Sequence, residues 1–309
     1  MKQLTRREAL GSMAGMLTGA LAVRTVLTPA LAAGEEKLII SGASGQLGGL
    51  AIKALLGRGV PARNLILVSR TPQGLAGYAQ LGAVTRFGDF TQPQSLTAAF
   101  AGGARMLLIS IGFSSTPRPV AHGHAIDAAK AAGVRQIAYT SWIGITKGDT
   151  AGLAVDHLAT EKLLQDSGLA WTSLRNSIYM EEVLPQAAKM VTDGRATVPS
   201  GEIPLGYVTR GNCADAAAAV LTTPGHDSRA YDITGPALLG VREIATAVSS
   251  VAGRPITVVP APAGSPPARG FATPAASVVS TAVADLTGRS PTSIREFLAA
   301  NRDRLLGTS

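Results

Sequence analysis

Three glycines at a fixed spacing are the residues of this chain best suited to chemistry. Gly42, Gly45 and Gly48 follow an apolar run that starts at Lys37, and a helical pattern of apolar residues begins directly after them. In such a strand–turn–helix unit the first glycine permits a tight turn, the second lets the backbone approach a pyrophosphate, and the third lets the helix pack closely. The amides at the helix start then face the phosphates. The spacing predicts dinucleotide binding; a purely structural turn is the alternative.

The preferred cofactor depends on the end of the second predicted strand, Asn64–Ser69. A site for NAD places Asp or Glu there to bond the ribose hydroxyls, whereas this chain has Ser69-Arg70-Thr71. Arg70 can form charge-assisted hydrogen bonds to a 2′-phosphate, and no acid in this segment competes for it. The sequence therefore predicts NADP(H). A solvated surface arginine is the alternative.

Two further segments are expected to lie along the cofactor. Asp89 and Phe90 follow a third strand, where Asp89 can accept from the adenine amino group and Phe90 can line the base. Asp89 as the N-cap of a helix at Ser95–Phe100 is the alternative. Ser110 and Ile111 end a fourth strand and are expected beside the cofactor.

Strands and helices alternate over the first half of the chain. The predicted strands are Lys37–Ser41, Asn64–Ser69, Ala83–Phe87, Arg105–Ser110, Arg135–Ser141 and Trp171–Asn176. This alternation predicts the α/β class, with a Rossmann-like, doubly wound parallel sheet that binds ligands at the carboxyl ends of its strands.

The alternation becomes irregular after residue 176, and a smaller C-terminal α/β substrate lobe is expected there. We divide the chain into residues 1–33, a signal peptide, residues 34–175, the nucleotide-binding domain, and residues 176–309, mostly the lobe, with some segments that return to the sheet. The later elements expected are helices at Glu181–Val191, from Cys213, at Val241–Ala252 and at Ser293–Leu306, a strand at Tyr231–Ile233 and a Pro/Gly/Ala-rich loop at Pro260–Pro274.

Composition excludes several other classes of protein. The chain has 309 residues, 46% of them hydrophobic, which is enough for one α/β domain with a smaller appended part. The net charge of +8 is not gathered into Lys/Arg-rich runs with interleaved aromatic residues, so we do not expect nucleic-acid binding. Cys213 is the single cysteine, and the four histidines lack metal-ligand spacing. We therefore expect no metal site, and a buried structural role for Cys213.

The first 33 residues have the pattern of an export signal. Arg6 and Arg7 lie in a twin-arginine-like segment, which is followed by the mildly apolar run Gly11–Val23 and the small residues Pro29–Ala33. We expect export by the twin-arginine machinery to the periplasm, with membrane contact only during passage. That route carries folded proteins, which suits a fold that takes up its cofactor first. An uncleaved anchor or a disordered extension is the alternative.

Several further segments carry a specific likeness. They are Gly42–Gly48, Leu107–Ser110, Ala128–Gly133, Ala138–Ser141, Thr160–Leu164, Leu174–Asn176, Tyr179 and Val208–Arg210. Together they resemble the NmrA-like branch of the atypical short-chain dehydrogenases/reductases, most closely its NAD(P)H:quinone oxidoreductase and triphenylmethane reductase type. The likeness runs from Lys37 to Ala252 and resumes at Asp285–Thr292.

The resemblance implies hydride transfer from NADPH to a quinone, a dye or a similar conjugated small molecule. The protein would bind and orient, while the cofactor carries the electrons. The cofactor-binding residues that it implies, together with those read from the strand ends, are Gly42, Ala43, Ser44, Gly45, Gln46, Leu47, Arg70, Asp89, Phe90, Ile109, Ser110, Ile111, Thr140, Asn176, Ser177 and Tyr179. The candidate catalytic residues are Lys162, Tyr179 and Asn176.

One departure from the wider superfamily concerns the proton donor. The superfamily uses Tyr-x-x-x-Lys, but the residue four positions before Lys162 is Leu158. Lys162 is expected to contact the ribose or to set a positive potential; a surface ion pair with Glu161 or Asp166 is the alternative. His157 is adjacent and offers an acid. A hydroquinone anion can take its proton from water, so the missing tyrosine favours quinone-like acceptors.

Two other departures affect the substrate and the compartment. Between Val259 and Ala284 the chain is shorter than the helical lid of the family, so the acceptor cannot be transferred from the family. NADPH is not regenerated in the periplasm, so an exported enzyme must retain and recycle its cofactor. Two alternative functions therefore stay open: a non-catalytic NADP-binding sensor of the NmrA type, and an isomerase or sugar-modifying enzyme that retains NADP.

Overall fold

The computed structural model describes residues 36–112, 114–145, 152–265 and 273–308. The predicted signal peptide lies outside the described residues, as does the middle of the Pro/Gly/Ala-rich loop. Within the described part of the chain, no helix is both long and apolar enough to cross a membrane.

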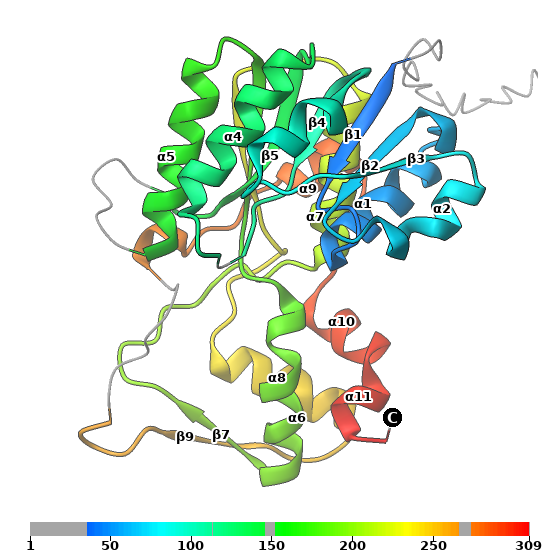
Figure 1. The fold of residues 1–309 in the computed structure, drawn as a ribbon. Coiled ribbons are helices and arrows are strands. Elements are labelled where there is room, and N and C mark those ends of the chain that lie inside the picture. Colours follow the sequence, from blue (N-terminus) through cyan, green and yellow to red (C-terminus); the bar gives the residue numbers. More distant parts are fainter. Residues whose placement is uncertain (1–35, 113, 146–151, 266–272, 309) are drawn as a thin grey trace, which may run out of the picture.

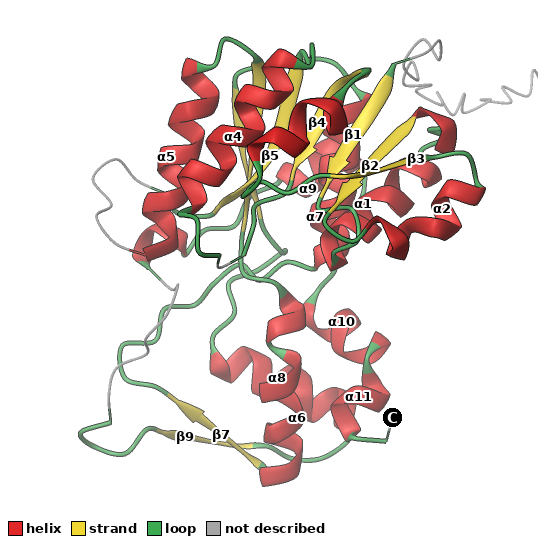
Figure 2. Ribbon diagram, in the orientation of Figure 1, coloured by secondary structure: helices red, strands yellow, loops and turns green. Residues whose placement is uncertain are grey.

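A seven-stranded parallel sheet forms the centre of the larger body (Figure 2). Its strand order is β3-β2-β1-β4-β5-β6-β8. The strands are β1 (Lys37–Ser41), β2 (Leu65–Ser69), β3 (Val84–Phe87), β4 (Gly103–Leu108), β5 (Gln136–Trp142), β6 (Ala170–Asn176) and β8 (Arg229–Ile233). The central strands are apolar on both faces because helices cover the sheet on both sides. The order reverses between β1 and β4, which is where such sheets bind ligands.

Two layers of helices enclose this sheet. The helices α1 (Gln46–Gly57), α7 (Arg210–Thr222) and α9 (Ala282–Thr287) pack together over one face. The helices α3 (Leu96–Phe100), α4 (Arg118–Ala131) and α5 (Gly152–Asp166) cover the other face. The short helix α2 (Ala76–Gln80) lies beside β3. The predicted doubly wound α/β fold is confirmed.

The second body is a smaller lobe with a core of its own (Figure 1). It consists of α6 (Leu184–Asp193), α8 (Val241–Ala252), α10 (Ile294–Ala300), α11 (Arg302–Leu306) and the parallel pair β7 (Arg195–Val198) and β9 (Thr257–Pro260). Segments of the second half, α7, β8 and α9, pack on the large sheet instead. The chain therefore crosses between the bodies several times, and residues 176–182 begin the first crossing at the end of β6.

The structure corrects three details of the sequence prediction. The expected helix Ser293–Leu306 is interrupted at Asn301, whose side chain donates to the carbonyl of Phe297 at 2.9 Å and competes with the helical pattern. The alanine-rich helix starts earlier than Cys213, because Thr209 caps the amide of Asn212. The strands β7 and β9 were not predicted, since each is short and partly exposed.

The fourth strand also ends earlier than predicted, at Leu108 rather than Ser110. Beyond Leu108 the amides bond to side chains instead of to a neighbouring strand. The amide of Ile109 donates to Ser41 Oγ at 3.0 Å, and the amide of Ser110 donates to Thr140 Oγ1 at 2.9 Å. The chain leaves the sheet here and opens the site.

Candidate active site

The glycine turn has the geometry that its sequence predicts. Gly42 has a φ of +63°, which favours glycine. A Cβ on Gly48 would lie 2.3 Å from the carbonyl oxygen of Gly42, so only glycine lets α1 pack this closely. Gly45 is the N-cap of α1, and the first turn of that helix holds no acidic residue. The free amides and positive dipole end of α1 therefore remain available to a phosphate group.

A first cleft of about 580 Å³ opens in front of this turn. It lies at the carboxyl ends of β1, β2, β3 and β4, as expected for a doubly wound sheet. Its lining residues are Gly42, Ser44, Gly45, Ser69, Arg70, Thr71, Gly88, Asp89, Phe90, Thr91, Ile109, Ser110, Ile111, Gly112 and Ser114. The structure thus brings together most of the predicted cofactor-binding residues.

Hydroxyl groups and one guanidinium occupy the end of the first cleft at β2. Ser44 Oγ lies 2.6 Å from Ser69 Oγ and 3.1 Å from Thr71 Oγ1. Arg70 between them is exposed and has no ion-pair partner among the described residues. A cation without an acid beside it, next to hydroxyl donors, suits a phosphate ester rather than a ribose diol.

Asp89 and Phe90 line the first cleft after β3. Asp89 Oδ1 accepts from the amide and the hydroxyl of Thr91, at 2.9 and 2.8 Å. The carboxylate therefore stabilises its own turn, and the alternative in which it caps α3 is wrong, because the N-cap residue there is Ser95. Phe90 is buried and lines the first cleft.

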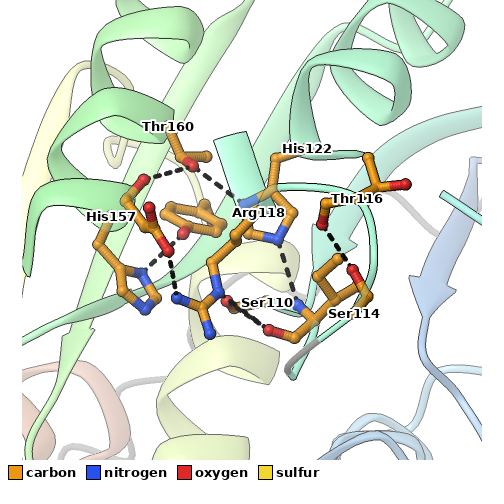
Figure 3. Close-up of polar contacts among 10 residues, drawn as sticks. Ser110, Ser114, Thr116, Arg118, His122, His157 and Thr160 are labelled. Atoms are coloured by element: carbon orange, nitrogen blue, oxygen red, sulfur yellow. Dashed lines mark hydrogen bonds and ion pairs between the residues drawn. The ribbon is translucent and has the colours of Figure 1, made fainter. Parts of the chain in front are cut away.

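Ile111 continues the segment after β4 and is fixed by two side chains of α4, Arg118 and His122, which Figure 3 shows. Its amide donates to His122 Nε2 at 3.1 Å, and its carbonyl accepts from Arg118 Nε at 3.0 Å. Arg118 is also ion-paired with Asp156 at 2.9 Å. Because His122 Nε2 accepts, Nδ1 carries the proton and donates to Thr160 Oγ1 at 3.0 Å. These bonds hold the backbone that the first cleft presents to a ligand.

The same surroundings keep His122 uncharged. Its side chain is fully buried, and burial together with the positive charge of Arg118 lowers its pKa to about 3. An imidazolium would lose the acceptor that Ile111 needs. His122 is therefore a neutral anchor for the loop.

A second cleft of about 480 Å³ adjoins the first, and Ile109 and Ser110 line both. Its lining residues are Leu47, Ile109, Ser110, Thr140, Ser141, Trp142, Leu153, His157, Asn176, Ser177, Ile178, Tyr179 and Glu182. Most of this surface is apolar or aromatic, and Glu182 is its single carboxylate among the described residues. A flat, conjugated molecule can lie here beside a dinucleotide that extends over from the first cleft.

The predicted residues after β6 lie in this second cleft. Asn176 Nδ2 donates to the Tyr179 hydroxyl at 3.3 Å, and Arg210 lies over the Tyr179 ring at 4.5 Å from its centroid. Burial raises the pKa of Tyr179 above its usual value, so the phenol stays protonated. Asn176 Oδ1 and Ser177 Oγ are buried without a hydrogen-bond partner in the described part of the chain.

Lys162 is not brought to either cleft. Its side chain on α5 is 67% exposed, and its Nζ lies 2.5 Å from the Asp166 carboxylate. This is the geometry of the alternative, a surface ion pair, and it gives no support to a contact with the ribose. The neighbouring Glu161 is buried and instead binds Arg175 at 2.7 Å and Ser141 Oγ at 2.7 Å. Glu161 thus joins Arg175 to Ser141, which lines the second cleft.

Two other predicted residues line neither cleft. Ala43 is buried, and its amide donates to the carbonyl of Val68 at 3.0 Å. Gln46 is the exposed first residue of α1, so it can offer its backbone amide to a phosphate. Sequence reasoning missed Trp142, which lies just beyond the Ala138–Ser141 segment. It raised His157 as an alternative acid, and the structure places this residue in the lining of the second cleft.

An NADP dinucleotide fits the residues that are present. The glycine turn leaves a space that a Cβ on Gly48 would fill, and the exposed Arg70 can bind an anion in the first cleft. Buried polar atoms without partners cost about 1–3 kcal/mol each, so Asn176 Oδ1 and Ser177 Oγ are placed to bond a polar group such as a carboxamide. No cluster of three or more metal-ligating side chains occurs among the described residues.

Known proteins share this fold and sequence pattern. Residues 42–224 match the family model described as NAD(P)H-binding. Quinone oxidoreductase 2 of Escherichia coli is 35% identical over 222 residues, which cover 71% of this chain and 76% of that protein. The NAD(P)H azoreductase of Xenophilus azovorans is 28% identical over 223 residues, covering 72% of this chain and 76% of that protein.

A solved structure extends the likeness to nearly the whole fold. The triphenylmethane reductase of Citrobacter sp., complexed with NADP(H), superposes with a TM-score of 0.76 and 30% identity, over 85% of this chain and 99% of that one. The matched family model spans the glycine turn, both clefts' central residues and α7. The chain therefore belongs to the NmrA-like, NAD(P)H-binding family.

Proposed function

We propose that this protein is an NADPH-dependent oxidoreductase that transfers hydride to a quinone or a similar conjugated acceptor. The observation that carries the proposal is the pair of adjoining clefts, which meet at Ile109 and Ser110. One cleft suits a 2′-phosphorylated dinucleotide, and the other is largely apolar and aromatic. The named relatives reduce quinones and azo dyes or carry the name of a dye reductase, which supports this acceptor class.

Residues of the first cleft bind the phosphate groups of the cofactor, and residues of the second cleft bind its nicotinamide and the acceptor. The free amides at the start of α1 would hold the pyrophosphate, and Arg70 with Ser69 and Thr71 would hold the 2′-phosphate. Asn176 and Ser177 offer polar atoms to the nicotinamide amide. The bound cofactor supplies the hydride. The protein's part is to hold acceptor and cofactor face to face and to keep water from the contact.

An acceptor of low basicity suits this arrangement. The position of the superfamily's tyrosine is Leu158, and Lys162 is exposed, ion-paired with Asp166 and lines neither cleft. The single carboxylate that lines the second cleft within the described residues, Glu182, is ion-paired with Arg210. A quinone takes up hydride and becomes a hydroquinone anion that its ring stabilises, so its final proton can come from water.

The test is a cofactor and acceptor survey of the purified protein. NADPH oxidation is followed with a panel of quinones, azo dyes and triphenylmethane dyes, and any copurified nucleotide is identified. Turnover with quinones at rates well above those with simple ketones is expected. Tight NADPH binding without turnover on any acceptor would contradict the proposal and favour a redox sensor.

We also propose export by the twin-arginine route, on the sequence pattern around Arg6 and Arg7. The full-length chain is expected in the periplasmic fraction of a Gram-negative host. The double variant Arg6→Lys, Arg7→Lys is expected to remain in the cytoplasm, and Arg24→Lys serves as the matched control. Retention of the unaltered chain in the cytoplasm would contradict the proposal.

A further inference from the structure

The second cleft contains one buried histidine that the proposed function has not yet used. His157 on α5 is 5% exposed, lines the second cleft and stacks on Trp142, with ring centroids 6.2 Å apart and an angle of 28°. Its Nδ1 lies 2.7 Å from the hydroxyl of Tyr139, a fully buried residue of β5. Its Nε2 has no hydrogen-bond partner in the part of the chain that the structure describes.

The surroundings of His157 hold it neutral. Burial lowers its pKa to about 3, and the positive charge of Arg118 and the nearby His122 ring act in the same direction. Asp156 is the nearest carboxylate of α5, but it is ion-paired with Arg118 at 2.9 Å. Figure 3 shows this group of side chains, with His157 and His122 on opposite sides of Arg118. At neutral pH the imidazole therefore has one acceptor nitrogen and one donor N–H.

Tyr139 decides which nitrogen carries the proton. A phenol is a better hydrogen-bond donor than acceptor, and burial raises the pKa of Tyr139, so its hydroxyl keeps its proton. The hydroxyl donates to His157 Nδ1, which leaves the proton of the imidazole on Nε2. The ring that lines the second cleft thus offers an N–H donor there.

We propose that neutral His157 donates this Nε2–H hydrogen bond to the carbonyl oxygen of the acceptor, with Tyr139 as the positioning residue that fixes the tautomer. The inference rests on the proposed function and concerns one part of its substrate class, the acceptors with a carbonyl oxygen in conjugation. When the acceptor takes up the hydride with its electron pair, negative charge develops on that oxygen. NADPH is oxidised to NADP⁺, the quinone is reduced, and the oxygen finally takes a proton from water.

A fixed donor at a developing oxyanion stabilises the transition state more than the ground state. A neutral imidazole is suited to this work because it donates without first having to be protonated. His157 is one position before Leu158, where the superfamily has its tyrosine. The proposed hydrogen-bond donor, His157, therefore lies in the same helical turn as the superfamily's tyrosine position but is a histidine.

The acceptor itself provides the decisive control. A quinone develops an oxyanion, whereas a triphenylmethane dye takes hydride on a cationic carbon and develops none. His157→Phe keeps a ring against Trp142 but removes the donor. We expect the variant to lower kcat for quinones by roughly tenfold to a hundredfold, while dye turnover and NADPH affinity change by less than about threefold. His157→Gln, which retains an N–H donor, is expected to keep more quinone turnover.

The chain offers a matched histidine–tyrosine pair away from both clefts. His226 Nδ1 lies 2.9 Å from the Tyr231 hydroxyl. His226→Phe and Tyr231→Phe are expected to leave both activities within about twofold. Tyr139→Phe is expected to lower quinone turnover alone, by less than His157→Phe, and to shift the tautomer of His157. Nitrogen-15 long-range NMR spectra of the unaltered protein are expected to show His157 as the neutral Nε2–H tautomer at pH 7.

The outcomes separate this inference from the proposed function. Equal loss of quinone and dye turnover in His157→Phe, no loss of either, or an Nδ1–H tautomer overturns the role of His157 and leaves the oxidoreductase assignment intact. An unaltered protein that binds NADPH but reduces no acceptor overturns both.

Discussion

The two clefts adjoin at Ile109 and Ser110 but are built in different ways. The first is lined by four short segments that each follow directly on a strand, and its important groups are backbone amides, small hydroxyls and one arginine. The second gathers side chains from α1, β5, α5 and the segment after β6. Cofactor binding therefore depends on local turns with strict backbone requirements, whereas the acceptor site depends on packing between distant elements. Substitutions in the first cleft should therefore weaken cofactor binding, whereas substitutions in the second should affect the reaction with the acceptor.

Gly48→Ala should give the largest loss of cofactor binding, because the added Cβ clashes with the backbone of the glycine turn. The added Cβ would lie 2.3 Å from the oxygen of Gly42 and 2.8 Å from the Cα of Ala43. We expect NADPH binding below detection in fluorescence titration, and a loss of about 1–3 kcal/mol in the free energy of unfolding. Gly49→Ala is the matched control, since nothing lies within 4 Å of its Cβ position. It should stabilise α1 slightly, and equal behaviour of both variants would refute the close-packing argument.

Arg70→Ala should alter the choice of cofactor without harming the turn. Arg70 is exposed in the first cleft, so its loss leaves no buried partner. Loss of a charge-assisted bond to the 2′-phosphate costs about 1–3 kcal/mol, which is about 5- to 150-fold in affinity. NADPH binding should weaken by this factor and NADH binding should not, as measured by titration of each. Arg63→Ala is the control. Equal weakening of NADPH and NADH binding in Arg70→Ala would refute the assignment of Arg70 to the 2′-phosphate.

The two buried histidines, His122 and His157, should make the free energy of unfolding depend on pH. Burial lowers the pKa values of His122 and His157 to about 3, below those of unfolded histidine. Between about pH 6.5 and pH 3 the unfolded chain therefore binds more protons than the folded chain does. The free energy of unfolding is highest above this window and decreases as the pH falls through it. Each histidine contributes at most about 1.4 kcal/mol per pH unit.

His122→Gln separates the anchor from the rest of the molecule. Urea unfolding of this variant should show lower stability at neutral pH, because Ile111 loses a bond, and a shallower decline on acidification. An undiminished decline in the variant would show that His122 is not a source of the acid sensitivity.

Lys162→Met should give the smallest effect, because the residue lies outside both clefts. An exposed i,i+4 ion pair such as Lys162–Asp166 contributes at most about 0.5 kcal/mol. NADPH affinity and kcat should stay within about twofold of the unaltered protein. A tenfold loss of either, with unchanged thermal stability, would instead support the ribose contact expected from the superfamily.

The first cleft was largely predictable, since each of its parts follows a strand along the chain. Gly42, Arg70 and Asp89 could be assigned because a parallel α/β alternation places all strand ends at one edge. The second cleft was predictable in part, through Leu47, Thr140, Asn176, Ser177 and Tyr179. Trp142 was missed and His157 was raised only as an alternative acid, because nothing in the sequence tells which face of a helix meets which strand end.

The sequence by itself determined the parallel sheet, the phosphate-binding turn and the likeness to the NmrA-like family, because these depend on spacing within short segments. The tertiary structure decided what long-range packing controls. It placed Lys162 on the surface beside Asp166, joined Glu161 to Arg175, and directed His157 to Tyr139 and the second cleft. Adjacent residues of one helix point in different directions, and only the packed partners of that helix reveal which of them reaches the site.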